Sequence, residues 1–588
     1  MLIAQLQHAL HQAVAPILPD ADLSRVLLRP CSNPQHGDYE TTALMGLAKE
    51  RKMNPRQLAT DVLAQLNVQE LCESVTISGG GFLNFRLRNE ALGAAVAGAA
   101  RGEHLFFTPA PNPRTVVIDF SSPNVAKPLH VGHIRSTFLG DCLARVFRTL
   151  GHRVVTDNHI GDWGTQFGML LVGWKSQLDR AALEADPIAE MERLYKTVSA
   201  ACKEDTAIRE TARAELVRLQ AGDATNLEIW QEMQRLSQAQ FDRIYSRLGI
   251  RFDHTLGESF YNPRLAGVVE SLLNQGIAKT SEGAIGVFSD GTQAPKEDPF
   301  LIQKDGEWQP NPFLIRKSDG GFNYATTDLA TLAYRLETWN PAEILYVTDG
   351  RQQLHFRQLF ATFRRIHPGH PVRLEHVWFG SILGEDGKPF KTRSGDTVKL
   401  TDLLDEAEER ALKTIAAKNP ELPVDEQRAM ARLIGLGAIK YADLVPNRQS
   451  DYVFSWDKLL ALNGNTAPYL QYAYTRTRSL QRKGADIGPP AHLPPALPLS
   501  APEELSLARH LLNFGYTLEG VAGDYRPNFL CNYLYELAGR FSQFWENCPV
   551  LKAEDPAVRA SRAALCEVTS RVLRLGLELL GIQTLERM

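Results

Sequence analysis

The hydrophobic pattern of the first hundred or so residues predicts a small mixed module. Apolar side chains near the start recur every three or four residues, as on one face of a helix (Leu2, Leu6, Leu10, Val14, Ile17). Asn54 followed by Pro55 is typical of a helix start, and short apolar runs on both sides of the glycines at 79–81 are typical of a β-hairpin. Residues 1–107 therefore predict an α+β domain, and the proline-rich stretch 108–113 predicts a linker.

A second pattern begins after the linker, where apolar runs of strand length alternate with helical stretches. These runs lie at 114–120, 152–158, 343–349 and 376–383. Buried strands that alternate with helices indicate a parallel, Rossmann-like sheet. Between the second and third runs, residues at about 175–260 are highly charged and follow a helical period, so they predict a helical insertion. We therefore expect an α/β domain with a Rossmann-like parallel sheet at 113–399.

From about residue 400 onward the pattern is helical, with no convincing strand. We expect a connecting helical segment at 400–445 and an all-helical domain at 446–588. Within that domain, residues 484–504 hold six prolines between Pro489 and Pro502. Because helical pattern flanks this stretch on both sides, we interpret it as a long exposed loop and not as a domain boundary.

Composition narrows the class of protein. The chain has 588 residues, of which 44% are hydrophobic and 22% charged, so it is globular and long enough for roughly four domains. These values exclude a disordered or collagen-like protein. The formal net charge of -4 provides no overall basic field, so any surface that binds nucleic acid must be local.

Cysteine spacing and hydropathy indicate a protein of the reducing cytosol. The seven cysteines are scattered, with no spacing typical of zinc ligands, so we expect reduced structural thiols and no metal site. The start of the chain lacks the basic and unbroken apolar regions of a signal peptide. The most apolar run, 91–100, is about half the length needed to span a bilayer. We expect a soluble, cytoplasmic protein with no membrane partner.

The strongest chemical signal is His130-Val131-Gly132-His133, which follows a strand and a loop and opens a helix. Histidines three positions apart share a helical face, and the glycine between them lets a flat ligand approach the backbone. The free N–H groups of a helix start suit phosphates, and imidazoles there can stabilise developing negative charge. Composition alone predicts roughly 0.03 such motifs by chance. The alternative is a pair of capping or surface histidines.

Other nucleotide-binding motifs fail. The segment Gly384–Pro389 is too short for a P-loop and ends in proline where a P-loop has serine or threonine. No dinucleotide fingerprint follows the first predicted strand.

The residues around the histidine motif carry a resemblance to a known family. The segments DFSSPNVAKPLHVGHIRSTFLGD and NHIGDWGTQFG resemble the ATP-binding core of class I aminoacyl-tRNA synthetases, and within that class the arginyl-tRNA synthetase family. Similar matches are NPQHGDYETTALMGLAK, FGSILGEDGKPFKTRSGDTVKL, NTAPYLQYAYTRTRS and GIQTLERM, so the resemblance covers nearly the whole chain. It implies the class I fold, in which His130, Gly132 and His133 bind ATP, as do Gly161, Asp162 and Gly164.

The second family signature departs from its usual pattern. In the segment 390–395, Lys391 and Arg393 are basic, but Ser394 stands where many relatives have a second lysine. Activation of an amino acid by ATP requires positive charge near the departing pyrophosphate. The resemblance implies that Lys127, just before the histidine motif, substitutes for the missing lysine. We expect Lys127, Lys391 and Arg393 to share this catalytic task; the alternative for Arg393 is a solvated basic loop.

Residues suited to arginine recognition follow from the chemistry of the guanidinium group, which carboxylates hold best. Asp119 ends the first strand of the predicted sheet, where ligands of such sheets bind. Tyr324 and Asp328, four residues apart, share one helical face. The family resemblance adds Asn124 and Gln352 to an arginine pocket formed with these three. Many relatives have glutamate at position 119, and Asp328 could instead be a charge that stabilises a helix start.

The best local surface for tRNA is the helical stretch 469–483. It carries four basic residues and no acidic one, with tyrosines interleaved. The pairs Tyr472/Arg476 and Tyr474/Arg478 suit unstacked bases flanked by phosphates. The alternative is a solvated basic helix face. The resemblance places this stretch and Met588 in an anticodon-binding domain, and it relates the first domain to one that contacts the tRNA elbow.

Together the resemblance implies ATP-dependent attachment of L-arginine to tRNA(Arg) through an arginyl-adenylate. ATP would carry Mg²⁺ as part of the substrate, and we expect a monomer. A small nucleotidyltransferase also uses the histidine motif, but the long helical half disfavours that class. A second alternative is another class I synthetase, and a third is a non-catalytic tRNA-binding protein. Against the third, Lys127, His130, Gly132, His133 and Asp162 are all present.

Overall fold

The computed structural model describes residues 1–391, 398–483 and 493–588. It contains two compact units, one formed by residues 1–109 with 458–588 and the other by residues 110–457. The segment 400–445, which the sequence set apart as a connector, belongs to the second unit, and that unit continues to 457 where the sequence placed a boundary at 446.

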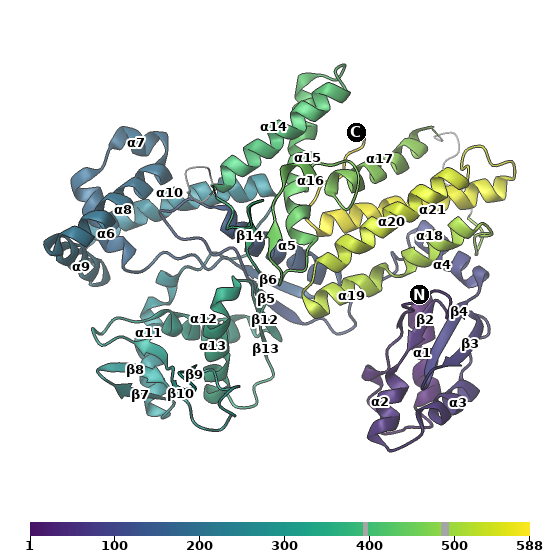
Figure 1. The fold of residues 1–588 in the computed structure, drawn as a ribbon, viewed down its shortest axis with the longest axis horizontal. Helices are drawn as coiled ribbons and strands as arrows, with labels where there is room; N and C mark the ends of the chain where they lie inside the picture. Colours follow the sequence, from purple (N-terminus) through teal and green to yellow (C-terminus); the bar gives the residue numbers. More distant parts are fainter. Residues whose placement is uncertain (392–397, 484–492) are drawn as a thin grey trace. The chain divides into compact units, whose positions relative to one another are not determined.

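A parallel sheet lies at the centre of the second unit (Figure 1). Its strand order is β13-β12-β5-β6, and every neighbouring pair is parallel, which confirms the Rossmann-like prediction. The strands are β5 (Thr115–Asp119), β6 (Arg153–Asp157), β12 (Glu343–Tyr346) and β13 (Arg373–His376). Helix α5 (Ile134–Thr149) packs so closely on the end of β5 that a Cβ on Gly140 would lie 2.2 Å from the Phe120 ring.

The strand predicted at 376–383 was wrong in its position. The observed strand β13 ends at His376, and the predicted stretch contains only β14 (Ile382–Leu383), which pairs with β15 (Tyr452–Val453). The physical reason is that β13 lies at the edge of the sheet, where exposed Arg373 alternates with buried Leu374. Such a half-exposed strand has no continuous apolar run, so the pattern of a fully buried strand misses it.

The predicted helical insertion is confirmed. Helices α6 to α10 follow one another between β6 and α11, and Figure 1 shows α6 to α9 gathered apart from the sheet. Aspartates cap four of the helix starts, because their carboxylates accept the free backbone N–H groups (Asp179, Asp186, Asp205, Asp223). The helices are α6 (Gln166–Gln177), α7 (Arg180–Ala185), α8 (Pro187–Glu204), α9 (Thr206–Gln220), α10 (Ala224–Leu248) and α11 (Glu258–Asn274).

The remaining elements of the second unit complete the surroundings of the sheet. Two small antiparallel sheets are formed by β7 (Ala278–Ser281), β8 (Ala284–Val287) and β11 (Phe313–Arg316), and by β9 (Leu301–Lys304) and β10 (Glu307–Pro310). The helices are α12 (Tyr324–Trp339), α13 (Gln353–Ile366), α14 (Leu400–Lys418) and α15 (Val424–Leu444), with 3-10 turns η2 (Val131–His133) and η3 (Gly350–Gln352). Helix α16 (Trp456–Leu459) spans the boundary between the units.

In the first unit, the N-terminal module has the predicted mixed character. Its antiparallel sheet has the order β1-β2-β4-β3, and the predicted hairpin around the glycines is formed by β3 and β4. Asn54 caps α3 with its side chain, as expected. The elements are α1 (Leu2–Val14), η1 (Leu23–Arg25), β1 (Arg29–Pro30), β2 (Tyr39–Thr41), α2 (Ala43–Glu50), α3 (Pro55–Gln65), β3 (Cys72–Ser78), β4 (Phe82–Leu87) and α4 (Asn89–Arg101).

The C-terminal part of the first unit is helical, as predicted. Its helices are α17 (Ala467–Lys483), α18 (Pro502–Leu512), α19 (Phe514–Asp524), α20 (Asn528–Asn547) and α21 (Pro556–Leu579). In the proline-rich stretch, residues 484–492 lie outside the described residues. The prediction of full exposure was wrong for its later part, because Leu497 and Leu499 are buried. A Cβ on Gly93 of α4 would lie 2.2 Å from the Leu497 carbonyl oxygen, so a glycine makes room for this segment.

Candidate active site

The two histidines of the motif form a turn in which each ring binds the backbone. The Gly132 N–H donates to His130 Nδ1 at 3.0 Å, and the His130 N–H donates to His133 Nδ1 at 3.1 Å. The ring centroids lie 4.0 Å apart. Because Nδ1 accepts a hydrogen bond in both rings, each neutral imidazole carries its proton on Nε2. The pair therefore offers two N–H donors to a ligand without needing a positive charge.

The surroundings keep both rings neutral. Burial, with a smaller contribution from the neighbouring His130, lowers the pKa of His133 to about 3. Burial also lowers the pKa of His130, with a smaller contribution from the Lys127 ammonium. A Cβ on Gly132 would lie 2.8 Å from the His130 ring, so the glycine is required by this turn as well as by ligand approach. The histidines are thus uncharged hydrogen-bond donors near pH 7.

The basic residues differ in how the structure places them. Lys127 lies close enough to His130 to affect its pKa, and its Nζ is 5.1 Å from the centroid of the Tyr195 ring. Lys391 is exposed. Arg393 lies outside the described residues. Val398 lies beside the histidine turn, since the Val131 N–H donates to its carbonyl at 2.9 Å.

Asp119 is buried at the carboxyl end of β5, where its carboxylate already has a guanidinium partner. Arg335, which is fully buried on α12, donates from Nη2 to Asp119 Oδ2 at 2.7 Å and to Asp157 Oδ2 at 2.8 Å. The Ser122 hydroxyl donates to the other oxygen of Asp119. An internal arginine thus occupies the position that the sequence suggested for a substrate guanidinium.

A second group of carboxylates lies at the start of α11 and α12. Burial raises the pKa of Glu258 to about 8, and the negative charges of Asp162 and Asp328 contribute. Burial, and secondly the nearby Glu258 carboxylate, raise the pKa of the Tyr324 phenol. Tyr324 is nevertheless 70% exposed. The Asp328 carboxylate has a partner within the chain, because it lies 2.5 Å from His355 Nε2. A carboxyl group whose pKa is raised among other carboxylates is a candidate position for a bound cation.

This acidic group lies at the same edge of the sheet as Asp119. Tyr346, the last residue of β12, is buried, and the charges of Asp119 and Asp328 both raise the pKa of its phenol after burial. The start of α5 is tied to the same edge, because the Ser136 hydroxyl donates to the Val347 carbonyl at 2.6 Å. The start of α5, which follows the histidine turn, and the Asp119 and Asp328 carboxylates therefore lie at the carboxyl ends of the parallel strands, where such sheets bind ligands.

Three family models match the chain and together cover most of it. They are tRNA synthetases class I (R), catalytic domain, at residues 100–456; Arginyl tRNA synthetase N terminal domain, at 2–87; and DALR anticodon binding domain, at 470–588. The chain belongs to the arginyl-tRNA synthetase family.

Full-length relatives agree with the family models. Arginine–tRNA ligases of a Synechococcus strain and of Salmonella agona are 46% and 45% identical to the chain; the alignments cover 100% and 95% of it, and 99% and 95% of the relatives. Among solved structures, arginyl-tRNA synthetases of Thermus thermophilus and Plasmodium falciparum align over the full chain with TM-scores of 0.82 and 0.79 at 25% and 27% identity, covering 100% and 99% of those chains. The expected class I fold is confirmed, and a small nucleotidyltransferase is excluded.

The other residues that the family resemblance implied lie on loops beside this site. Asn124 is exposed, and a Cβ on Gly161 would lie 2.2 Å from its Oδ1, so the two loops meet there. Gly164 has a φ of +136°, which only glycine adopts readily. Gln352 is exposed at the end of η3.

Asp162, which the family resemblance assigns to ATP binding, is hydrogen-bonded to two helices of the same unit. Its carboxylate accepts hydrogen bonds from the Ser259 N–H at 2.8 Å and from the Ser259 hydroxyl and the Gln234 amide. The Trp230 indole donates to its carbonyl at 2.9 Å. Asp162 thus ties its loop to α10 and α11, and through Ser259 it positions the adjacent Glu258.

Sequence reasoning missed Glu258. It lies 96 positions beyond Asp162 and 70 before Asp328, so no local spacing connects the three. The only signal was a Gly-Glu-Ser start to a helix directly after the insertion, which is also an ordinary helix start.

In the arginyl-tRNA synthetase family the helical domain at the end of the chain is the anticodon-binding part, and α17 belongs to it. The Arg476 guanidinium lies 5.9 Å from the Tyr472 ring centroid and 5.0 Å from that of Trp545, and Tyr472 is 44% exposed. The pair Tyr474/Arg478 was a wrong prediction for base stacking. Tyr474 is buried, and both side chains bond to the Glu586 carboxylate, at 3.2 and 2.9 Å.

The end of the chain explains why Tyr474 and Arg478 differ from Tyr472 and Arg476. The Glu586 carboxylate packs back on α17, and its backbone carbonyl accepts a hydrogen bond from Arg482 at 2.7 Å. This acidic partner comes from more than a hundred residues further along the chain, so the local pattern could not show it. Met588, the last residue, is half-buried.

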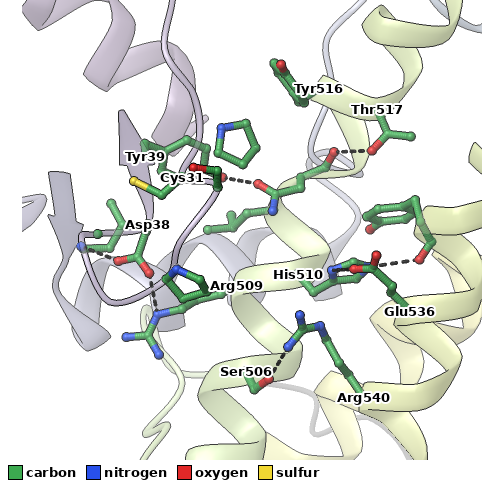
Figure 2. A pocket seen from close by; sticks show the side chains of 18 of the residues that line it. Cys31, Asp38, Tyr39, Ser506, Arg509, His510, Tyr516, Thr517, Glu536 and Arg540 are labelled. Carbon is green, nitrogen blue, oxygen red and sulfur yellow. Dashed lines mark hydrogen bonds and ion pairs between the residues drawn. The ribbon is translucent and has the colours of Figure 1, made fainter. Parts of the chain in front are cut away.

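A cavity of about 850 Å³ lies between the N-terminal module and helices α18 to α20, within the first unit (Figure 2). Two of the guanidinium groups that line it have partners: Arg509 lies 2.9 Å from Asp38, and Arg540 donates to the Ser506 hydroxyl at 2.7 Å. His510 bonds a backbone carbonyl of α20 at 3.0 Å. These contacts form a polar interface between the N-terminal module and helices α18 to α20 of the first unit.

Among the described residues, no cluster of three or more histidine, cysteine, aspartate or glutamate residues has the geometry to hold a metal ion. Across the same residues, no helix combines the length and the apolar character needed to cross a membrane.

Proposed function

We propose that the chain attaches L-arginine to tRNA(Arg) in two steps. The arginine carboxylate attacks the α-phosphate of ATP to form arginyl-adenylate, and pyrophosphate leaves. A ribose hydroxyl at the end of the tRNA then attacks the acyl carbonyl and AMP leaves. The observation that carries this proposal is the placement of neutral histidine donors and of a group of carboxylates at one edge of a parallel sheet.

The phosphates would be held by groups around the histidine turn. The two Nε2–H donors of His130 and His133 can bind phosphate oxygens as charge builds on the leaving pyrophosphate. Lys127, adjacent to this turn, would supply positive charge, and Lys391 and Arg393 would share that task as the family signature implies. Gly132, Gly161 and Gly164 would leave room for the nucleotide. Little covalent chemistry is required of the protein, so positioning and charge stabilisation provide the rate.

The arginine side chain would be held by carboxylates. Asp328 is near enough to raise the pKa of Glu258, and Glu258 in turn raises that of Tyr324, whereas Asp119 is already bonded to Arg335. This difference favours Glu258 and Asp328 over Asp119 as direct ligands. Asn124 and Gln352 remain proposed contacts of the amino acid on the family resemblance. An uncharged competitor would leave these carboxylates without a guanidinium partner, so selectivity requires no separate editing site.

The other partners follow from the reaction. Mg²⁺ would arrive on the ATP phosphates as part of the substrate. We propose that Tyr472, Arg476, Arg478 and Met588 contact tRNA(Arg), with the charge of Arg478 shared with Glu586, and that Asp162 positions the ATP-side loop. The N-terminal module would contact the tRNA elbow. We propose a monomer that acts in the cytoplasm.

Arginine-dependent ATP–pyrophosphate exchange, measured with and without tRNA(Arg), tests the proposal. His130→Ala removes one phosphate donor, so we expect exchange to fall by roughly 2–4 kcal/mol of transition-state stabilisation while tRNA binding is kept. His8→Ala, at an exposed histidine of α1, is the matched control and should leave exchange unchanged. No exchange in either condition would favour a non-catalytic tRNA-binding protein, and exchange with another amino acid would refute the specificity.

A further inference from the structure

The loop between β5 and the histidine turn has an unusual backbone. Three of its residues that are not glycine have positive φ angles: Ser121 at +75°, Ser122 at +49° and Ala126 at +61°. A side chain in this left-handed region is disfavoured, and such residues persist only where their surroundings hold them. Ala126 immediately precedes Lys127, so the backbone that directs the Lys127 side chain is one that needs support.

That support comes from helix α10 of the insertion. The Ser237 hydroxyl accepts a hydrogen bond from the Ala126 N–H at 2.9 Å. Two turns further along α10, the Tyr245 hydroxyl bonds the Ser121 hydroxyl at 2.7 Å. Ser237 and Tyr245 are buried and share one face of the helix. The two ends of the strained loop are therefore held by one helix face.

A second helix of the insertion contacts the Lys127 side chain itself. The Lys127 Nζ lies 5.1 Å from the ring centroid of Tyr195 on α8, which is the geometry of a cation–π contact. Lysine is a flexible side chain with a single point of charge, so its ammonium is located only where a neighbour restrains it. The Tyr195 ring, on the helical insertion, restrains the Lys127 ammonium, which lies near His130.

We propose that the helical insertion positions the Lys127 ammonium toward the departing pyrophosphate, with Ser237 and Tyr195 as positioning residues. Ser237 holds the backbone at Ala126, and Tyr195 orients the ammonium. This inference rests on the proposed function, because it assigns to the insertion the task of aiming a group that acts in arginine activation. Neither residue reaches the reacting atoms itself.

Exchange kinetics of the full chain with tRNA(Arg) test this proposal. Ser237→Ala should lower kcat about tenfold, because a misplacement of 1 Å can cost a catalytic group up to a hundredfold. Tyr195→Leu should lower kcat about threefold, as expected for loss of a partly exposed cation–π contact. The KM for arginine should not change in either variant. Ser246→Ala, at an exposed serine of the same helix, and Tyr195→Phe, which keeps the ring, are the matched controls and should behave as the unmodified chain.

Combination with a Lys127 variant separates positioning from a general effect on folding. Lys127→Ala should lower kcat about a hundredfold, and adding Ser237→Ala or Tyr195→Leu to it should have little further effect. Ala126→Gly should restore activity to Ser237→Ala, since glycine adopts the left-handed conformation without support. Thermal midpoints are measured alongside; if Ser237→Ala does not fold, the Tyr195 variants decide.

Each outcome has a distinct meaning. Equal losses in the presence and absence of Lys127, or normal kcat in Ser237→Ala and Tyr195→Leu, would overturn the inference and leave the proposed function intact. Absence of arginine-dependent exchange in the unmodified chain would overturn the proposed function, and this inference with it.

Discussion

Two groups of carboxylates lie at the same edge of the sheet, and they differ in burial and in the partner that the chain supplies. Asp119 and Asp157 share the guanidinium of Arg335, at 2.7 and 2.8 Å. Glu258, with Asp162 and Asp328 nearby, instead has a pKa raised to about 8. The same chemistry can thus serve two purposes. The first group, closed by an internal arginine, holds two strands and a helix together, and under the proposed function the second group would select a free arginine.

Removal of the internal guanidinium is expected to have the largest effect. Arg335→Met leaves two buried carboxylates without their partner, so the free energy of unfolding should fall by about 3–5 kcal/mol, measured by urea titration. Arg264→Met removes a surface arginine that pairs with Glu337, and it should cost less than about 1 kcal/mol. A loss for Arg335→Met as small as that of the control would mean that the network does not stabilise the fold.

Neutralisation of a carboxylate in the second group should change the KM for arginine and not the free energy of unfolding. Asp328→Asn removes one carboxylate from the proposed guanidinium site, so the KM for arginine should rise by about 2–4 kcal/mol in equivalent free energy, with the KM for ATP unchanged. Asp305→Asn, at an exposed aspartate of the β9–β10 turn, is the control. An equal rise in the KM values of both substrates would place Asp328 outside the arginine site.

The raised pKa of Glu258 predicts a pH dependence of arginine binding. At pH 6.5 the carboxyl group is protonated, and a bound guanidinium favours the ionised form, so binding releases a proton. Affinity for arginine should therefore rise about tenfold between pH 6.5 and 8, measured by calorimetry in buffers of different ionisation enthalpy. In Glu258→Gln this rise should disappear. A pH-independent affinity in the unmodified chain would contradict the assignment.

The raised pKa of Glu258 also predicts that, without arginine, the folded state becomes less stable as pH rises. Between its ordinary pKa of 4.5 and about 8, Glu258 holds a proton in the folded state that the unfolded state has lost. Its contribution to stability is therefore present at low pH and is lost as pH rises through this window. The thermal midpoint of Glu258→Gln relative to the unmodified chain should increase from pH 5.5 to pH 8.5.

Local patterns predicted the features that are local in the structure. The histidine turn, the parallel strands at 115–119 and 153–157 and the helices of the insertion all follow from residues close in sequence. The site could be predicted only in part, because Glu258, Arg335 and Ser237 act through partners far along the chain. Tyr474 was misread for the same reason, since its burial depends on the terminal segment.

The histidine turn and the Glu258 carboxyl respond differently to a change in pH. Both rings use their Nδ1 atoms on backbone N–H groups, and the pKa of His133 is about 3. Both rings are therefore neutral near pH 7, and under the proposed function they would bind phosphate without a positive charge. A change in turnover between pH 6.5 and 8 would then follow the ionisation of Glu258, whose pKa is about 8.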